Sequence, residues 1–171
     1  MKNIKGDLWE HVGRTDLICI TTNAFVKSNG QAVMGKGCAK EATIRYPGIA
    51  AKLGRKTLKK SPPVAGLVKD RGTYICSFMV KPGSAIFNGS NAVKHMIPKF
   101  KVGDLVPGWA CLADIELIKA SAKHLMEIMD GHEFKSAVIP RPGCGAGELK
   151  WSEVEPILQT ILDDRVSVIT F

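Results

Sequence analysis

The 171-residue sequence lacks a hydrophobic run long enough to span a membrane, and charged residues follow the first methionine too closely for a secretory signal. We therefore expect a cytoplasmic protein without a membrane partner. The five cysteines include no CxxC pair, and the four histidines have no metal-ligand spacing. These absences disfavour a zinc site and a disulfide framework, and they predict reduced thiols, no metal site and no cofactor.

Aromatic residues are scarce at 6%, whereas 24 Lys and Arg residues outnumber 16 Asp and Glu residues and give a net charge of +8. A basic balance attracts polyanions, either nucleic acid or a ligand that carries phosphates, but it also serves solubility alone. The charge by itself does not separate these explanations. No platform of aromatic and basic residues stands out along the chain, which argues against a dedicated nucleic-acid-binding protein.

The composition, with 45% hydrophobic and 23% charged residues, is that of an ordinary globular protein, and the length predicts a single domain over residues 1–171. Its pattern alternates strands with helices. Strands are expected at 16–23, 64–80 (as a pair around a turn), 136–140 and 166–171, and helices at 35–46, 48–60, around 118–129 and after 152. This alternation predicts helices on both faces of a mixed, largely parallel sheet, that is, a three-layer α/β/α fold.

Two segments carry distinctive local signals. Residues 82–110 are rich in proline and glycine, so we expect an irregular insertion or lid there rather than a core element. The last helix is predicted to begin at Ser152, whose spacing to Glu155 is that of a capping box.

Two glycine-rich segments each follow an expected strand and precede an expected helix. The first, 23–42, contains Gly35 and Gly37, and the second, 141–149, contains GCGAG at 143–147. Glycine lets backbone N–H groups approach a ligand closely, and a helix N-terminus adds unpaired donors. Two such loops facing each other suit a diphosphate, although either could be a turn that needs glycine only for its geometry. Neither loop has the Walker A pattern, and no GxGxxG follows the first strand.

In four segments that occur in the same order, the chain resembles the macrodomains, which are ADP-ribose-binding modules. These segments are 6-GDLW-9; 21-TTNA-24 with 33-VMGKGCAKEA-42; 140-PRPGCGAGELKW-151; and the terminal strand ending at Phe171. The resemblance runs from one end of the chain to the other and leaves out mainly residues 82–110. The branch it resembles most is that of the terminal ADP-ribose protein glycohydrolases and related bacterial and phage macrodomains.

The resemblance implies contacts at the adenine and ribose ends of the ligand. Asp7 matches the aspartate that accepts a hydrogen bond from the adenine amino group, with Leu8 beside it, and Phe171 matches a residue that packs on the adenine ring. Without the resemblance, Asp7 reads as a helix cap and Phe171 as a frayed terminus. Asn23 matches the asparagine that stands near the distal ribose.

The resemblance assigns the rest of the ligand to the two glycine-rich loops. The first wraps the distal ribose and one phosphate, and the second binds the diphosphate mainly through backbone N–H groups. The residues concerned are Met34, Gly35, Lys36, Gly37 and Cys38 in the first loop, and Gly143, Cys144, Gly145, Ala146 and Gly147 in the second. Lys36 is either an added charge on the phosphates or a solvated side chain.

Catalysis in the resembled branch uses a lysine that attacks the anomeric carbon of the distal ribose, assisted by an acid in the diphosphate loop. Lys81, at the end of 71-RGTYICSFMVK-81, matches the lysine, although lysines at strand ends are common. The position of the acid holds Gly147, and Glu148 follows one residue later. Glu148 is therefore either a substitute acid or a solvated charge. A lysine nucleophile also needs a lowered pKa.

The leading expectation is an enzyme that binds ADP-ribose and hydrolyses a group attached at its distal ribose. The substrate would be an ADP-ribosylated protein, an ADP-ribosylated nucleic acid or ADP-ribose 1''-phosphate, and nucleic acid would be a partner only as a modified substrate. A monomer is expected. The alternative, suggested by Gly147, is a module that binds ADP-ribose or a related nucleotide without turnover.

Overall fold

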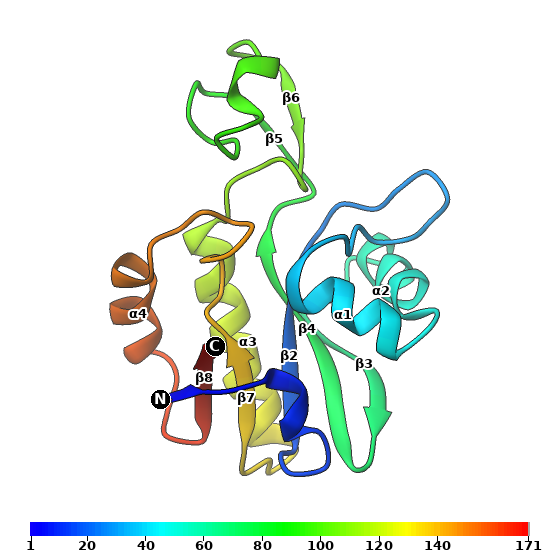
Figure 1. Ribbon diagram of the computed structural model, residues 1–171, viewed down its shortest axis with the longest axis vertical. Coiled ribbons are helices and arrows are strands. Elements are labelled where there is room, and N and C mark those ends of the chain that lie inside the picture. Colours follow the sequence, from blue (N-terminus) through cyan, green and yellow to red (C-terminus); the bar gives the residue numbers. More distant parts are fainter. Residues whose placement is uncertain (171) are drawn as a thin grey trace.

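The computed structural model describes residues 1–170, in which the main sheet has six strands (Figure 1). Their order across the sheet is β1 (Lys2–Lys5), β8 (Val166–Thr170), β7 (Ala137–Pro140), β2 (Leu17–Asn23), β4 (Thr73–Lys81) and β3 (Val64–Asp70). Neighbouring strands are parallel except for the antiparallel pair of β3 and β4. The predicted mixed, largely parallel sheet is therefore confirmed. Sequence patterning did not predict β1, because its residues KNIK are mostly polar and exposed.

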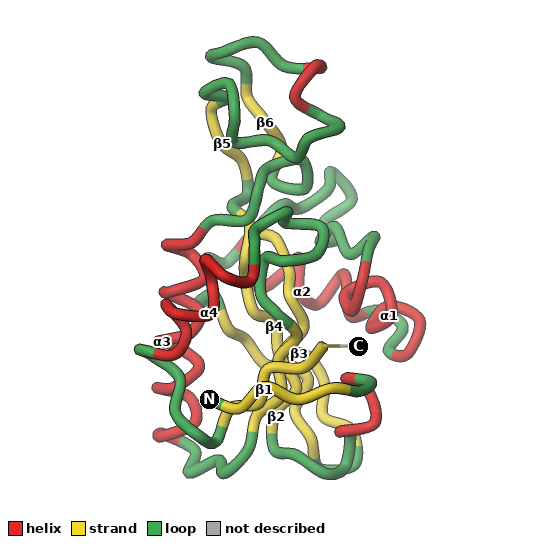
Figure 2. Tube along the Cα trace, turned by 60° about the vertical axis from the view of Figure 1, so that its left-hand side comes forward, coloured by secondary structure: helices red, strands yellow, loops and turns green. Residues whose placement is uncertain are grey.

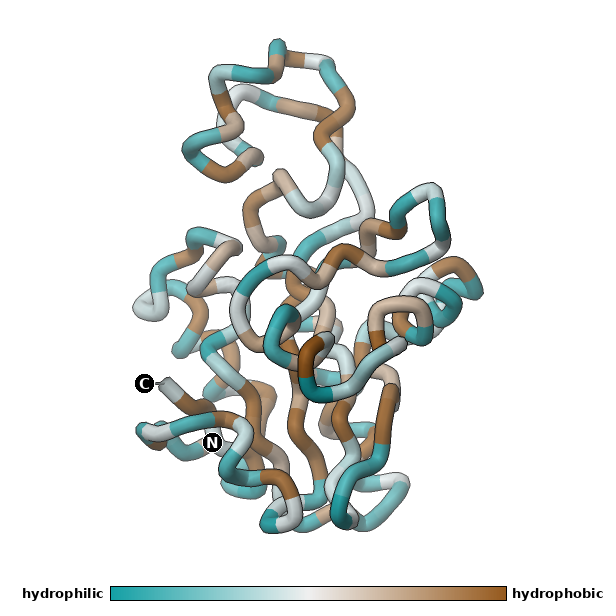
Figure 3. The backbone as a smooth tube through the Cα atoms, turned by 45° about the vertical axis from the view of Figure 1, so that its right-hand side comes forward, coloured by the Kyte–Doolittle hydropathy of each residue, from teal (hydrophilic) through white to brown (hydrophobic). Residues whose placement is uncertain are grey.

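Helices cover both faces of this sheet. On one face, α3 (Ile115–Gly131) and α4 (Trp151–Gln159) pack their apolar stripes on the strands. On the other face lie α1 (Gly37–Arg45), α2 (Ile49–Leu58) and the 3-10 helix η1 (Leu8–His11). Figure 3 shows hydrophobic residues concentrated along the central strands and polar residues along the loops. The α/β/α layering expected from the sequence is present, and none of the helices described is long and apolar enough to cross a membrane.

The N-termini of two helices, α3 and α4, are capped differently. Asp114 caps α3, since its side chain accepts hydrogen bonds from the N–H groups of Glu116 and Leu117. The predicted capping box of α4 is wrong. The helix begins at Trp151, so Ser152 lies inside its first turn, and the cap residue Lys150 provides no side-chain hydrogen bond.

The segment predicted to be irregular forms a small body of its own above the C-terminal ends of the strands (Figures 1 and 2). It contains the antiparallel strands β5 (Ser84–Ile86) and β6 (Leu105–Pro107) and the 3-10 helix η2 (Ile97–Lys99). A separate apolar core holds it together and consists of Phe87, Ala92, Val93, Met96, Val106, Ala110 and Cys111. The insertion is thus more ordered than its sequence suggested, because strands of three residues are too short to leave a readable pattern.

Candidate ligand pocket at the strand ends

The strands β2 and β4 end side by side beneath a pocket of about 980 Å³. Ligands of open α/β sheets bind in this place, beyond the carboxyl ends of the strands. Both glycine-rich loops line the pocket, and three residues of the insertion, Val93, His95 and Trp109, contribute to its wall. Most predicted site residues contribute to its wall: Leu8, Asn23, Met34, Gly35, Lys36, Gly37, Cys38, Lys81, Gly143, Cys144, Gly145, Ala146 and Gly147.

Two predicted residues, Asp7 and Glu148, fall outside this wall. Asp7 does not line the pocket, although Gly6 and Leu8 do. Its Oδ1 accepts a hydrogen bond of 2.8 Å from Trp9 N, so Asp7 caps η1. Glu148 does not line the pocket either. Phe171 lies outside the described residues.

Asn23 and Lys81 are neighbours across the β2–β4 ladder, where the register shifts at the end of β2. Their main chains are joined by a hydrogen bond of 3.0 Å from Ala24 N to Lys81 O. The Asn23 side chain fixes the loop that follows, because its Oδ1 accepts from Phe25 N at 2.9 Å and its Nδ2 donates to Val33 O at 3.0 Å. Asn23 therefore holds the first loop in place while it lines the pocket beside Lys81.

The first glycine-rich loop, residues 34–38, leads directly into α1. Gly35, Lys36 and Gly37 are exposed, and a Cβ atom on Gly35 or Gly37 would meet nothing within 4 Å. The helix starts at Gly37 without a side-chain cap on its N-terminal N–H groups. This end of α1 therefore faces the pocket with unpaired donors and the positive end of the helix dipole, the arrangement that binds anions.

The second loop, residues 143–147, uses its glycines in two ways. Gly145 is exposed with open space around it, like the glycines of the first loop. Gly147 is buried, and a Cβ atom there would lie 2.5 Å from Gly143 O and 2.6 Å from Ala113 Cβ. Main-chain hydrogen bonds from Leu149 N to Gly143 O and from Ala113 N to Gly147 O, both 3.0 Å, lock the loop against the start of α3. No acidic side chain could stand at position 147 without displacing this packing.

Lys81 is the most unusual side chain of the pocket, because it is a lysine with only 5% of its surface exposed. Its Nζ donates a hydrogen bond of 3.3 Å to Trp109 O, and within residues 1–170 it forms no ion pair with a carboxylate. Burial lowers the pKa of the Lys81 ammonium, the nearby charge of Lys36 lowers it further, and Cys111 and Glu148 partly oppose the shift. A buried lysine with a lowered pKa has a larger neutral fraction and is a better nucleophile.

Glu148 is exposed and has a left-handed backbone conformation with φ of +60°. Its Oε2 accepts a hydrogen bond of 2.9 Å from Lys94 N. The side chain therefore connects the second loop to the insertion instead of pointing among the pocket residues. Its charge still acts on Lys81, as the raising effect on the Lys81 pKa shows.

Several wall residues had been given no role by sequence reasoning. They are Thr21, Val93, His95, Trp109, Arg141 and Trp151. Arg141 lies over the Trp151 ring with 5.0 Å from its guanidinium carbon to the ring centroid. Val93, His95 and Trp109 come from the insertion, and only its folding over the strand ends brings them to the pocket. A sequence signal was available for Thr21, Arg141 and Trp151, because Thr21 lies within the 21–24 motif and the other two lie within the 140–151 motif.

No family model matches the chain. A curated relative, the DNA ADP-ribosyl transferase–DNA ADP-ribosyl glycohydrolase fusion protein of Thermosipho africanus (strain H17ap60334), is 24% identical over 139 residues. This match covers 78% of the chain and 33% of the relative, so the chain spans about a third of that protein's length.

Two solved structures show the same arrangement of elements. The macrodomain of Mycobacterium tuberculosis DarG superposes with a TM-score of 0.68 at 21% identity, and the match covers 98% of this chain and 95% of the other. Thermosipho africanus DarTG in complex with ADP-ribose gives a TM-score of 0.67 at 19% identity, covering 98% of this chain and 41% of the other. The overall architecture of the chain is thus that of these solved structures: the chain has the macrodomain fold.

Proposed function

We propose that this protein binds ADP-ribose in the pocket at the strand ends and removes ADP-ribosyl groups from a macromolecule, with Lys81 as the nucleophile. One observation carries the proposal: a buried lysine with a lowered pKa lines the pocket together with the two glycine-rich loops. Support comes from the macrodomain fold and from the solved neighbour described as bound to ADP-ribose. The name of the curated relative, a DNA ADP-ribosyl glycohydrolase in part, supports DNA as the macromolecule.

The proposed binding mode follows from the two loops. The N-terminus of α1 and the exposed backbone at Gly35 and Gly145 receive the diphosphate, because each offers N–H groups without a side chain in the way. The distal ribose then lies near Asn23 and Lys81, which are adjacent across the ladder. The adenine lies at the Gly6–Leu8 end of the pocket, where Asp7 is the expected acceptor.

The proposed reaction uses the neutral amine of Lys81. Its lone pair attacks C1'' of the distal ribose, the bond from C1'' to the target atom breaks, and the target leaves with the bonding electrons and gains a proton. The sugar–lysine adduct opens to an imine, water adds to the imine carbon, and ADP-ribose departs as the amine is restored. We assign the proton transfer to Glu148, which must first release Lys94 N to reach the leaving group.

A second candidate is a binding module that recognises ADP-ribose without turnover. It is favoured by the packing at Gly147, which excludes an acid at that position, and by the engagement of Glu148 with the insertion. The two candidates share the ligand and differ only in turnover.

The test begins with calorimetric titration of the protein with ADP-ribose. Incubation with an ADP-ribosylated oligonucleotide, an ADP-ribosylated peptide and ADP-ribose 1''-phosphate then identifies any turnover. Release of free ADP-ribose from a macromolecule supports the hydrolase, and binding without release from any substrate supports the binding module. The absence of both heat and thermal shift at millimolar ADP-ribose would overturn the proposal altogether.

A further inference from the structure

An exposed tryptophan lines the pocket, and its main chain contacts the proposed nucleophile. Trp109 is 42% exposed, and its main-chain oxygen accepts the hydrogen bond from Lys81 Nζ at 3.3 Å. The main chain is thus fixed to the lysine while the indole ring remains open to solvent. The pocket wall beside Lys81 thus includes an exposed aromatic ring.

Lysines whose ammonium groups form no ion pair within residues 1–170 accompany Trp109 on the insertion. Hydrogen bonds of 2.9 Å from Val93 N to Ala110 O and from Leu112 N to Asn91 O hold residues 91–93 against 110–112. Lys94 is exposed between two wall residues of the pocket, Val93 and His95. The ion pairs found within residues 1–170 involve Arg71, Lys119 and Arg165, so neither Lys94 nor Lys99 is neutralised by one.

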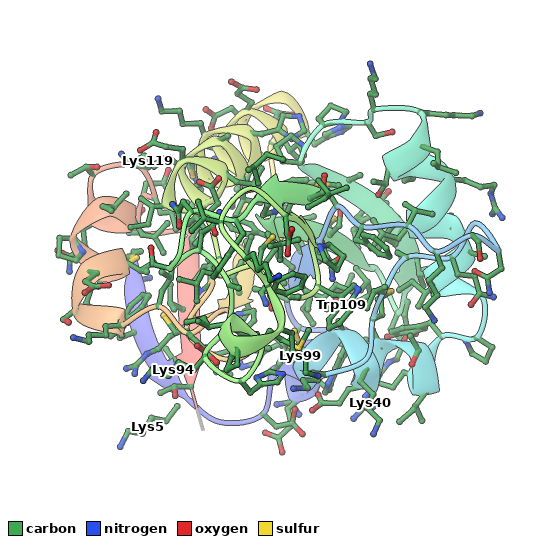
Figure 4. All side chains as sticks on the ribbon, turned by 90° about the horizontal axis from the view of Figure 1, so that it is seen from above. Lys5, Lys40, Lys94, Lys99, Trp109 and Lys119 are labelled. Atoms are coloured by element: carbon green, nitrogen blue, oxygen red, sulfur yellow. The ribbon has the colours of Figure 1, made fainter. Side chains whose placement is uncertain are left out.

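Figure 4 shows how these charges are distributed when the molecule is seen from the side of the insertion. Lys94 and Lys99 lie on the same side of the view as Lys5 and Lys40, whereas Lys119 of α3 lies on the opposite side. Trp109 lies nearer the middle. Two lysines of the insertion therefore lie on the same side of the view as Lys40 of α1, the helix whose N-terminus lines the pocket.

We infer that the insertion holds the macromolecular part of the substrate, a single strand of nucleic acid, with Trp109 stacked on an unpaired base and Lys94 and Lys99 beside phosphates. The inference rests on the proposed function and extends it from the ADP-ribosyl group to the strand that carries it. A single strand fits because stacking on an exposed ring needs a base with a free face, and because phosphates match the free ammonium groups. Exposed Ile86, Val102 and Leu105 on the same insertion would suit a protein partner instead, but they do not explain the free charges.

The first measurement is direct binding of an unmodified, fluorescently labelled single-stranded oligonucleotide, followed by anisotropy. We compare the wild type with Trp109→Ala, with the double variant Lys94→Glu/Lys99→Glu, and with the charge-matched control Lys123→Glu, which lies exposed on α3. The expected loss is about tenfold for Trp109→Ala, as for the removal of one stacked base. For the double variant, the salt dependence of log K should weaken by roughly 0.7 for each lost phosphate contact, and the control should bind as the wild type does.

The second measurement is kcat/KM for an ADP-ribosylated oligonucleotide and an ADP-ribosylated peptide. The ratio of the two values should fall about tenfold in Trp109→Ala and in the double variant, because only the oligonucleotide uses the surface. An equal loss for both substrates, or equal strand binding by the wild type and both variants, would overturn the inference even if ADP-ribose binding is intact. If ADP-ribose does not bind but the variants still bind the oligonucleotide more weakly than the wild type, the proposed function is wrong and the nucleic-acid-binding surface is supported.

Discussion

The two glycine-rich loops look alike in sequence but use glycine for different purposes. In the first loop, Gly35 and Gly37 have open space where a side chain would begin, so the glycines leave room for a ligand. In the second loop, Gly147 is buried against Ala113 and the Gly143 carbonyl, so the lack of a side chain there allows the loop to pack closely on the rest of the protein. Only Gly145 repeats the pattern of the first loop. A glycine-rich motif can therefore combine binding positions and packing positions, and substitution should separate them.

The largest effect is expected between the two loops, at Lys81. Lys81→Ala should abolish turnover while the affinity for ADP-ribose changes by less than about tenfold, because in the proposed binding mode the loops and not the amine hold the diphosphate.

Glu148→Ala should slow turnover too if Glu148 supplies the proton. Borohydride added with ADP-ribose should trap an adduct on Lys81, which mass spectrometry of peptides would locate. Normal turnover by Lys81→Ala would eliminate the lysine mechanism.

Gly35→Val and Gly145→Val should remove ADP-ribose binding, with a loss of about 100-fold or more, while the thermal midpoint stays near that of the wild type. The branched side chain would occupy the open space proposed for the ligand, and its Cβ atom would meet no protein atom within 4 Å at either position. Gly66→Val is the matched control, since Gly66 also has open space but lies on β3 and not on the pocket wall. If either loop variant bound ADP-ribose normally, its loop would be only a turn.

Gly147→Ala tests the packing position and should lower the free energy of unfolding by about 1–3 kcal/mol, the usual cost of overpacking. Gly145→Ala is its control and should leave stability almost unchanged, because nothing lies within 4 Å of the added atom. Urea denaturation of both variants gives the two values. Equal stabilities would contradict the distinction drawn between the glycines of the second loop.

Asp7→Asn separates a binding role from a capping role. Asparagine caps a helix about as well as aspartate, so its one side-chain oxygen should stay on Trp9 N and stability should be retained. Its NH2 group then replaces the second carboxylate oxygen and cannot accept from the adenine amino group, which should weaken ADP-ribose binding by about 1–3 kcal/mol. Calorimetry and thermal denaturation of the variant provide both values. Asp7→Ala should show the binding loss together with a loss of stability. Unchanged affinity in both variants would leave Asp7 as the cap of η1 only.

The smallest expected effect is a dependence of stability on pH. Burial and Lys36 lower the Lys81 pKa in the folded state, so over the range below the ordinary lysine pKa the unfolded chain binds more protons. The free energy of unfolding of the wild type should therefore rise with pH relative to that of Lys81→Met. Subtracting the unfolding free energies of the two proteins removes the contributions of the buried thiols other than Cys111, whose pKa is raised by burial and partly lowered by the charge of Lys81. A flat difference from pH 7 to about pH 10 would contradict the lowered pKa.

Much of the fold and part of the site could be predicted from local pattern. The stripe of α3 and the apolar runs of β2, β4 and β7 were readable because their burial repeats with the period of the element. The strand β1 was not readable, since its stability comes from pairing with β8 and not from an apolar face. Likewise, the capping-box spacing did not locate the start of α4, which begins at Trp151 after the cap residue Lys150.

The sequence by itself determined the alternation of strands and helices, and hence a layered sheet with glycine-rich loops at its strand ends. It also placed Lys81 at the end of a strand. Only the tertiary structure decided that Lys81 is buried, that Gly147 has no room for an acid, and that Trp109 of the insertion lines the same pocket. The physical reason is how far apart along the chain the interacting residues lie. Periodicity reports burial within one element, whereas a pKa shift, a steric limit or a shared surface arises from residues that only the folded chain brings into contact.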